Sequence, residues 1–254
     1  NDRATNSLTS PLANGGEAVG LVNVTKRFPG VVAVDDVSLG IRSGEVHVLL
    51  GENGAGKSTL FNLITGKYSL SGGEISLRDE VVSGLAPFQI NRKGLSRSFQ
   101  VTNIFPRMSV YENIRCGVLW SLGYKYSFWH IVDNLKDVNE RTAEILEEIG
   151  LQARAQIPAG VLTYAEQRAL EIGITIAGGA NVILLDEPTA GMSHSETDQA
   201  IALIRKVTEG RTLVMVEHDM GVVFGLADKI SVLVYGEIIA SGTPEEIKGN
   251  AAVK

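Results

Sequence analysis

The feature that most restricts the fold of this sequence is the eight-residue segment Gly51–Ser58. It reads Gly-Glu-Asn-Gly-Ala-Gly-Lys-Ser and stands between an apolar run, Val46–Leu50, and a helical pattern from Lys57 to about Thr65. This is the pattern of a P-loop, in which glycines let backbone N–H groups surround phosphate oxygens at a helix N-terminus. In such a loop, Lys57 supplies positive charge to the β- and γ-phosphates, and the Ser58 hydroxyl ligates Mg²⁺. Because a glycine turn matches this pattern by chance in about one chain in a hundred, we predict a nucleotide-binding strand–loop–helix unit.

The second half of the chain alternates between helical and strand patterns. Helical periodicity covers Tyr164–Ala177 and Glu196–Glu209, while short apolar runs cover Val182–Leu185 and Thr212–Val216. Strands that alternate with helices form a mostly parallel sheet. Together with the P-loop, this alternation predicts an α/β fold with a P-loop core.

Two further regions are expected to extend this core, namely an antiparallel β subdomain and an inserted helical subdomain. Strands are expected near the N-terminus at Leu21–Val24, Val31–Ile41, Glu74–Leu77 and Glu80–Val82, and a final strand pair is expected at Ile230–Tyr235 and Glu237–Ala240 around Gly236. Residues from about 89 to 160 lack a strand pattern, and a helix is expected at Arg141–Ile149, so we predict that the helical subdomain spans about residues 89–177. Residues 1–17 are rich in Asn, Ser, Thr and Gly and lack the apolar segment of a signal peptide. We expect them to form a flexible tail before a single domain over residues 18–254.

Charge and cysteine content argue against several classes of function. The formal net charge of −6 over 254 residues argues against broad, sequence-independent binding of nucleic acid, which needs a basic surface. Cys116 is the only cysteine, so no internal disulfide or cysteine-based metal cluster can form, and a reducing compartment is the simplest fit. The longest mostly apolar stretch, Gly173–Leu185, is too short to span a bilayer. Any link to a membrane is therefore expected to come through a partner.

Two adjacent carboxylates, Asp186 and Glu187, follow the apolar run Val182–Leu185. Many strands end in an acidic turn, so this pair alone has little specificity. Beside a P-loop it has the pattern of a Walker B element, in which Asp186 holds Mg²⁺. Glu187 is expected to point to the other side of the strand end, where a carboxylate can orient and deprotonate the attacking water.

The segment Leu162–Gln167 distinguishes between families of P-loop proteins. Its sequence, Leu-Thr-Tyr-Ala-Glu-Gln, predicts a capping box in which Thr163 and Glu166 open a helix. Since it also stands just ahead of the Walker B strand, the segment resembles the signature motif in the ATP-binding subunit of ABC transporters. The usual family pattern is Leu-Ser-Gly-Gly-Gln, and this chain departs from it at four of five positions. Leu162 is kept, Thr163 retains a hydroxyl, and Ala165 stands where the second glycine is usual.

Single residues elsewhere resemble further positions of that family. Phe28 resembles the aromatic residue that stacks on adenine, Gln100 the Q-loop glutamine that meets Mg²⁺ and the attacking water, and His218 the switch histidine that contacts the γ-phosphate. Taken alone, an aromatic residue is more often part of a core, and a polar residue or a histidine at a strand end is more often a surface residue. Residues Ala190–Ser193 occupy the place of the D-loop.

The resemblance covers about residues 19–247 and implies a set of site residues. The implied ATP contacts within the chain are Phe28, Gly51, Asn53, Gly54, Ala55, Gly56, Lys57, Ser58 and Thr59. In the family, signature residues reach the nucleotide of a second subunit, and those implied here are Thr163, Tyr164, Ala165 and Glu166. The implied Mg²⁺ ligands are Ser58, Gln100 and Asp186, and the implied catalytic residues are Glu187, His218, Gln100 and Lys57.

Finer features resemble one branch of the family, the importers of branched-chain amino acids. The similar segments are Phe61–Gly66, Arg97–Gln100, Glu187–Met192 and Glu217–Met220. An extra stretch around Gly117–Val138 carries Trp120, Tyr124, Tyr126 and Trp129. It is equally compatible with that branch's longer helical subdomain and with ordinary aromatic packing of an inserted helix pair.

The resemblance implies an ATPase that drives solute uptake as a peripheral subunit on the cytoplasmic face of the inner (plasma) membrane. The implied partners are transmembrane permease subunits, a second ATP-binding subunit (identical or different) and, indirectly, a periplasmic or extracellular solute-binding protein. No nucleic acid is expected. One alternative is an importer of urea, amides or other small solutes, which the sequence does not separate from an amino-acid importer.

Two alternatives come from other classes of protein. A non-transport ABC ATPase in DNA repair or translation typically carries a long coiled-coil insertion or a duplicated cassette, and this acidic chain has neither pattern. An unrelated P-loop kinase does not need the combination of Gln100, the signature segment and His218. Both are therefore less favoured than a transporter subunit.

Overall fold

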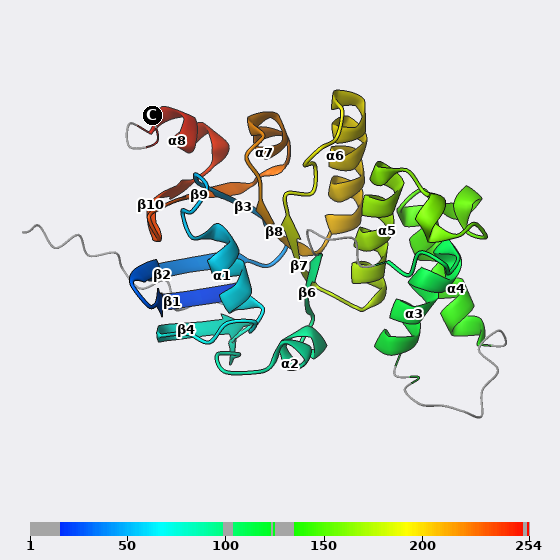
Figure 1. Cartoon of the computed structure of the whole chain (residues 1–254), viewed down its shortest axis with the longest axis horizontal. Helices are drawn as coiled ribbons and strands as arrows, with labels where there is room; N and C mark the ends of the chain where they lie inside the picture. The colour runs from blue at the N-terminus through cyan, green and yellow to red at the C-terminus, as the bar shows by residue number, and fades with distance from the viewer. Residues whose placement is uncertain (1–15, 99–103, 123, 125–134, 251–252, 254) are drawn as a thin grey trace, which may run out of the picture.

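Two β-sheets form the framework of the chain (Figure 1). The computed structural model describes residues 16–98, 104–122, 124, 135–250 and 253. The first sheet contains β1 (Glu17–Phe28), β2 (Val31–Arg42), β4 (Gly72–Leu77) and β5 (Glu80–Val81). Its order is β2-β1-β4-β5 and all its neighbours are antiparallel. The predicted antiparallel β region near the N-terminus is therefore present.

The second sheet has six strands and contains the P-loop strand. Its members are β3 (Val46–Leu50), β6 (Leu95–Ser98), β7 (Val182–Asp186), β8 (Thr212–Val216), β9 (Lys229–Val234) and β10 (Glu237–Gly242). The order is β10-β9-β3-β8-β7-β6, with parallel pairing from β9 to β6 and antiparallel pairing between β10 and β9. The mostly parallel sheet confirms the predicted α/β fold.

Helices cover both faces of the six-stranded sheet. The α-helices of the described residues are α1 (Lys57–Ile64), α2 (Pro87–Arg92), α3 (Val110–Ser121), α4 (Lys136–Glu148), α5 (Tyr164–Ala177), α6 (His194–Thr208), α7 (Met220–Leu226) and α8 (Pro244–Gly249). Successive strand residues point to opposite faces. Leu49 accordingly packs into the core that holds α1 and the antiparallel sheet, whereas Val48 and Leu50 pack into the core that holds α5, α6 and α7.

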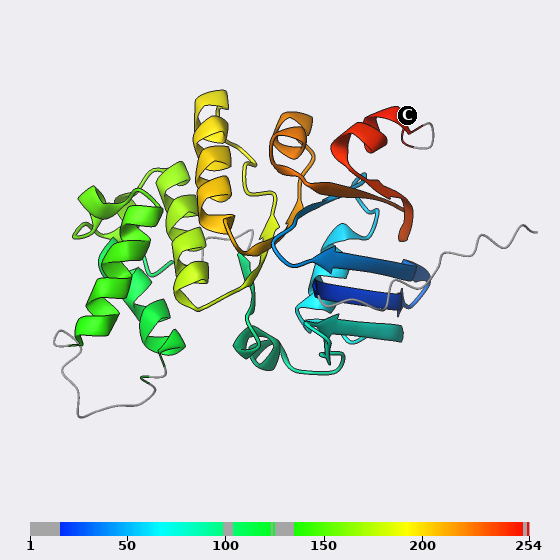
Figure 2. The same cartoon turned by 180° about the vertical axis from the view of Figure 1, so that it is seen from behind.

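The helices α3, α4 and α5 pack together at the end of the molecule opposite the antiparallel sheet, as both views show (Figures 1 and 2). Val110, Ile114 and Val118 lie on one face of α3 and are fully buried, together with Ile145 of α4 and Leu170 of α5. The spacing of four residues between these α3 side chains is typical of the apolar stripe of a helix packed against others. Two short 3₁₀ turns, at residues 152–154 and 159–161, connect α4 to α5.

Some elements differ from the sequence-based expectation. Strand β6 lies inside the stretch from about 89 to 160, for which no strand was expected. Strand β6 is the last strand of its sheet, and only Leu95 of its four residues is apolar. It therefore lacks the apolar pattern by which a strand is predicted. Strand β1 is longer than the predicted Leu21–Val24. Asn23 has a φ of 50° and the register shifts there, so the apolar alternation is interrupted and the sequence pattern predicts too short a strand.

Among the residues that the structure describes, no helix has the length and apolar character needed to cross a lipid bilayer.

Candidate nucleotide-binding site

The P-loop runs from the end of β3 into α1, and two of its glycines are needed for close packing. A Cβ on Gly51 would lie 2.3 Å from the Leu233 carbonyl oxygen, and one on Gly56 would lie 2.4 Å from the Ala33 carbonyl oxygen. Gly56 also has a φ of 106° and is the residue before α1, which has no side-chain cap hydrogen bond. The first N–H groups of α1 are therefore left to bind an anion at the positive end of the helix.

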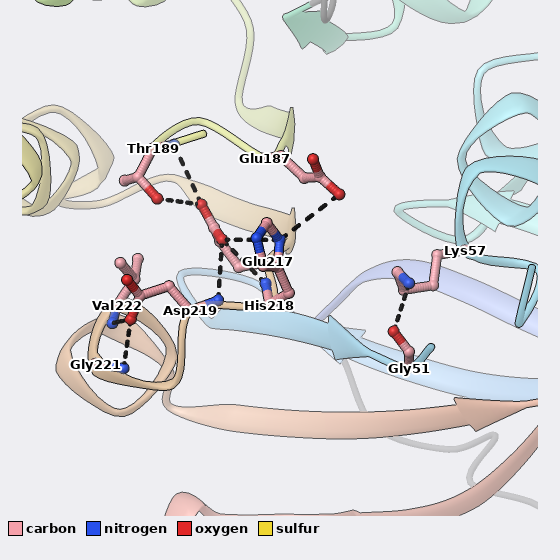
Figure 3. A network of polar contacts seen from close by, with 9 residues as sticks. All are labelled: Gly51, Lys57, Glu187, Thr189, Glu217, His218, Asp219, Gly221 and Val222. Atoms are coloured by element: carbon pink, nitrogen blue, oxygen red, sulfur yellow. Dashed lines mark hydrogen bonds and ion pairs between the residues drawn. The ribbon is translucent and has the colours of Figure 1, made fainter. Parts of the chain in front are cut away.

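Lys57 opens α1, and its side chain folds back over the P-loop (Figure 3). Its Nζ donates to the carbonyl oxygens of Gly51 at 2.6 Å and Glu52 at 2.9 Å. Burial lowers the pKa of Lys57, while the nearby carboxylates of Glu187 and Asp186 act in the opposite direction. The loop thus fixes an amino group beside the backbone that is predicted to bind phosphate.

The other predicted residues of the P-loop differ in their access to solvent. Asn53, Gly54 and Ser58 are exposed, Thr59 is half-buried and Ala55 is buried. The Ala55 carbonyl accepts a hydrogen bond from the Gly236 N–H at 2.9 Å, which ties the loop to the turn between β9 and β10. The exposed residues, Ser58 among them, are accessible to a ligand from solvent.

Asp186, the last residue of β7, is buried and paired. Its Oδ2 accepts a hydrogen bond from Arg97 Nη2 at 2.6 Å, and the Asp186 side chain is 2% exposed. Arg97 also donates from Nη1 to Asn62 Oδ1 at 2.7 Å, and its guanidinium lies 5.4 Å from the centre of the Phe61 ring. One arginine on β6 therefore joins the Walker B strand to α1. Sequence reasoning assigned Arg97 no role of its own.

Glu187 leaves β7 with its backbone in the left-handed region, at a φ of 47°. Its N–H donates to the Val216 carbonyl at 2.9 Å, so the pairing of β7 with β8 continues one residue beyond the ladder. Its carboxylate is half-buried, and Oε1 lies 3.8 Å from Nδ1 of His218 (Figure 3). This separation is too long for a hydrogen bond. The structure nevertheless brings the predicted base and the predicted switch histidine to adjacent strand ends.

Glu217, the residue before His218, makes contacts that sequence reasoning missed. It is 1% exposed, and its carboxylate accepts four hydrogen bonds (Figure 3). Oε1 accepts from the N–H and Oγ1 of Thr189, at 3.2 and 2.5 Å. Oε2 accepts from the N–H groups of His218 and Asp219, at 3.0 and 3.4 Å. Two loops that follow different strands thus share one buried carboxylate.

Phe28 lies at the end of β1 and is half-buried rather than part of a core. Its ring meets that of Tyr68 edge to face, with 5.6 Å between centroids. The Lys26 ammonium lies 5.0 Å from the centroid of Phe28 and 5.9 Å from that of Tyr68. Tyr68 was not singled out from the sequence, because a lone aromatic residue after a helix has no distinguishing pattern.

The signature segment opens α5 with the predicted cap. Thr163 Oγ1 accepts from the Glu166 N–H at 3.3 Å, and Glu166 Oε2 accepts from the Thr163 N–H at 2.9 Å. The bond from the Thr163 backbone lowers the pKa of Glu166, and Arg154 adds to this at 3.1 Å. Tyr164 is exposed and Ala165 half-buried. Figures 1 and 2 both show α5 well apart from α1, so one chain does not bring this segment to its own P-loop.

Gln100 lies outside the described residues, as do Tyr126 and Trp129 of the aromatic stretch. The part of that stretch inside the described residues includes Trp120, which is 43% exposed. Trp120 lines a cavity of about 250 Å³ between α2, β6, α3 and α5, together with Arg97.

The oxygen donors at this edge of the sheet fit Mg²⁺. Asp186 ends β7, and Ser58 stands in the first turn of the helix that follows β3, so both come from the carboxyl edge of parallel strands. Mg²⁺ prefers oxygen ligands and usually takes one or two from the protein, the rest being waters and substrate phosphates.

Comparison with known sequences connects this geometry to one family. The pattern of the ABC transporter family matches residues 34–190. LivG of Salmonella typhimurium LT2, a high-affinity branched-chain amino acid transport ATP-binding protein, is 39% identical over 237 residues, which are 89% of this chain and 92% of LivG. BraF of Pseudomonas aeruginosa PAO1, which has the same description, is 36% identical over 244 residues, 91% of this chain and 93% of BraF.

Solved structures give the same relationship. An ATP-binding cassette of an ABC transporter in its ADP conformation matches with a TM-score of 0.81 at 28% identity, covering 93% of this chain and 96% of that one. A dimeric cassette in a post-hydrolysis state, bound to ADP and Pi, matches with a TM-score of 0.73 at 25% identity, covering 89% of this chain and 98% of that one.

Proposed function

This chain belongs to the ABC transporter family as an ATP-binding subunit that hydrolyses ATP, and we propose that it powers the import of branched-chain amino acids. The observation that carries the choice of solute is the similarity to LivG and BraF, which extends over 92% and 93% of their lengths. Because the similarity covers nearly the whole length of both relatives, it is not limited to the P-loop.

The proposed nucleotide site uses the residues at the carboxyl edge of the parallel sheet. The P-loop backbone and Lys57 hold the phosphates, and Phe28 stacks on the adenine ring. The bent-back Lys57 side chain supports this, because its ammonium already lies at the loop carbonyls. Ser58, Asp186 and Gln100 hold Mg²⁺, which when bound neutralises charge on the phosphate oxygens.

Hydrolysis is proposed to depend on Glu187 and His218. Glu187 accepts the proton of the attacking water, since a carboxylate within hydrogen-bond reach of a water can act as its general base. His218 contacts the γ-phosphate, and Gln100 contacts the water. The 3.8 Å between Glu187 and His218 supports a shared site, in which positioning and charge stabilisation supply most of the catalysis.

A second ATP-binding subunit, identical or different, is proposed to complete the site. Because α5 lies apart from α1 within one chain, residues 163–166 would reach a nucleotide held by a partner's P-loop. A related cassette forms a dimer. The other proposed partners are transmembrane permease subunits and, through them, a periplasmic or extracellular solute-binding protein.

The proposed location is the cytoplasmic face of the inner membrane, where the chain is a peripheral subunit held by its permeases. The proposed division of the chain is a tail over residues 1–17 and an ATP-binding domain over 18–254, with the helical subdomain inserted over about residues 89–177. The packing of α3, α4 and α5 into one group supports that insertion.

Co-purification tests this proposal. The tagged chain is isolated from its own membranes, and the proteins that travel with it are identified. Permease subunits and a second ATP-binding subunit are expected. Recovery of the chain with DNA-repair or ribosomal proteins, and without a permease, would overturn the transport assignment. Recovery with a permease that takes up only urea or amides would change the solute and keep the ATPase role.

A further inference from the structure

We propose that Glu217 is a positioning residue that holds the Glu187 loop and the His218 loop in one fixed register and thereby sets the rate of hydrolysis. This inference rests on the roles proposed above for Glu187 and His218. The ladder between β7 and β8 ends at the pair Asp186–Val216, so Glu187 and Glu217 leave the sheet as neighbours. Glu217 is buried, whereas the side chains of Glu187 and His218 are 31% and 67% exposed.

The hydrogen bonds divide between the two carboxylate oxygens of Glu217. Oε1 serves the loop after β7 through Thr189, and Oε2 serves the loop after β8 through the backbone of His218 and Asp219 (Figure 3). An ionised carboxylate has only acceptors, and three of its four partners are backbone N–H groups that can only donate. The chemistry of the site therefore calls for a carboxylate.

The Glu187 turn depends on this anchor because its backbone is strained. A non-glycine residue in the left-handed region is held there only when its surroundings determine it. The Glu187 N–H is bound by the Val216 carbonyl, and the Glu187 carbonyl accepts from the Ala190 N–H at 3.2 Å. Thr189 lies inside that turn, and both its N–H and its hydroxyl donate to Oε1 of Glu217. Through Thr189, Glu217 thus holds the turn from which the Glu187 carboxylate projects.

The second loop is anchored in the same way. Oε2 of Glu217 holds the His218 N–H, and Asp219 caps α7 by accepting from the N–H groups of Gly221 and Val222 at 2.8 and 3.3 Å. The His218 ring itself lies 3.8 Å from Glu187 and 3.9 Å from Glu217. Within the described part of the chain, the hydrogen bond to the His218 backbone therefore places this histidine beside the base.

Three substitutions separate this role from a general contribution to folding. Glu217→Gln keeps the size of the side chain, but its amide NH₂ must face an N–H donor in either orientation. Placed at Oε2 it meets two backbone N–H groups, and placed at Oε1 it loses the Thr189 N–H. Thr189→Val removes the hydroxyl donor at nearly constant volume, and Thr189→Ser returns it.

The expected result is a fall in kcat with little change in nucleotide binding. Steady-state hydrolysis by the co-purified transporter is expected to fall about tenfold or more in Glu217→Gln, since small misplacements of catalytic groups have effects of that order. The KM for ATP and the affinity of the chain for a fluorescent ATP analogue are expected to stay within about twofold. Thr189→Val is expected to lose rate in the same way, and Thr189→Ser to recover most of it. The double variant is expected to lose little more than the larger single variant, because both act through one contact.

An unchanged kcat in Glu217→Gln and Thr189→Val would overturn the inference, and so would an equal loss of rate and nucleotide affinity or fully additive losses. If Glu217→Gln does not fold, the Thr189→Val and Thr189→Ser pair decides the question alone. Glu187→Gln is measured in parallel. Normal turnover in Glu187→Gln would refute the proposed base itself, whereas normal turnover only in the Glu217 and Thr189 variants would refute the positioning role and leave the base in place.

Discussion

Replacement of Arg97 with methionine is expected to lower the free energy of unfolding by about 3–5 kcal/mol, because it removes one partner of a buried ion pair. The Arg97 and Asp186 side chains are 11% and 2% exposed, with 2.6 Å between Nη2 and Oδ2. Methionine fills much of the space but leaves the Asp186 carboxylate buried without a cation, and Asn62 loses a hydrogen bond. In a domain of this size the melting temperature is expected to fall by roughly 6 °C or more.

Urea denaturation followed by circular dichroism measures this effect. Arg141→Met is the matched control, since Arg141 forms an exposed pair with Glu144 whose side chains are 36% and 63% exposed. That control is expected to change stability by less than about 0.5 kcal/mol. Adding Asp186→Asn to Arg97→Met removes the buried charge and is expected to recover part of the loss. If Arg97→Met and Arg141→Met unfold at the same urea concentration, the argument that Asp186 depends on Arg97 is wrong.

Three further substitutions test the nucleotide site. Glu187→Gln is expected to bind ATP and lose nearly all hydrolysis, because an amide cannot accept the proton of water; ATP should then produce a dimer on gel filtration, and normal turnover would place the base elsewhere. Lys57→Ala is expected to weaken binding of a fluorescent ATP analogue, because the charge facing the phosphates is lost; an affinity equal to that of the parent would contradict this. Ala165→Gly is expected to change the ATPase rate of the complex little, because the Thr163 cap fixes the first turn and directs the Ala165 methyl away from the phosphate. The same substitution is expected to destabilise α5 by about 1 kcal/mol at most. A rise of roughly tenfold or more, about 1.4 kcal/mol in the barrier, would show instead that the methyl holds the subunits apart.

The features predicted correctly from the sequence are local ones. The P-loop, the strand that ends at Asp186 and the cap at Thr163 each depend on a few adjacent residues, and the structure has all three at the expected positions. The alternation of helices and strands after Thr163 likewise predicted the parallel core. Such patterns are readable because the backbone conformation and burial of each residue depend on its immediate neighbours.

The features that were missed depend on contacts between distant residues. Arg97 and Asp186 are 89 positions apart, and Thr189 and Glu217 are 28 apart, so neither contact leaves a periodic signal. Strand β6 was missed because it has one apolar residue and is identified only by its pairing with β7. The role of Gln100 stays a prediction, since that residue lies outside the described part of the chain.

The central claim is that ATP hydrolysis by this chain powers the uptake of branched-chain amino acids. The most direct measurement uses proteoliposomes that contain the co-purified permeases, the solute-binding protein on one side and ATP on the side of this chain. ATP-dependent accumulation of labelled leucine is predicted with the parent chain, and accumulation at the ATP-free background is predicted with Glu187→Gln. Leucine uptake that is equal in the two preparations, or ATP-dependent uptake of urea without leucine, would contradict the account.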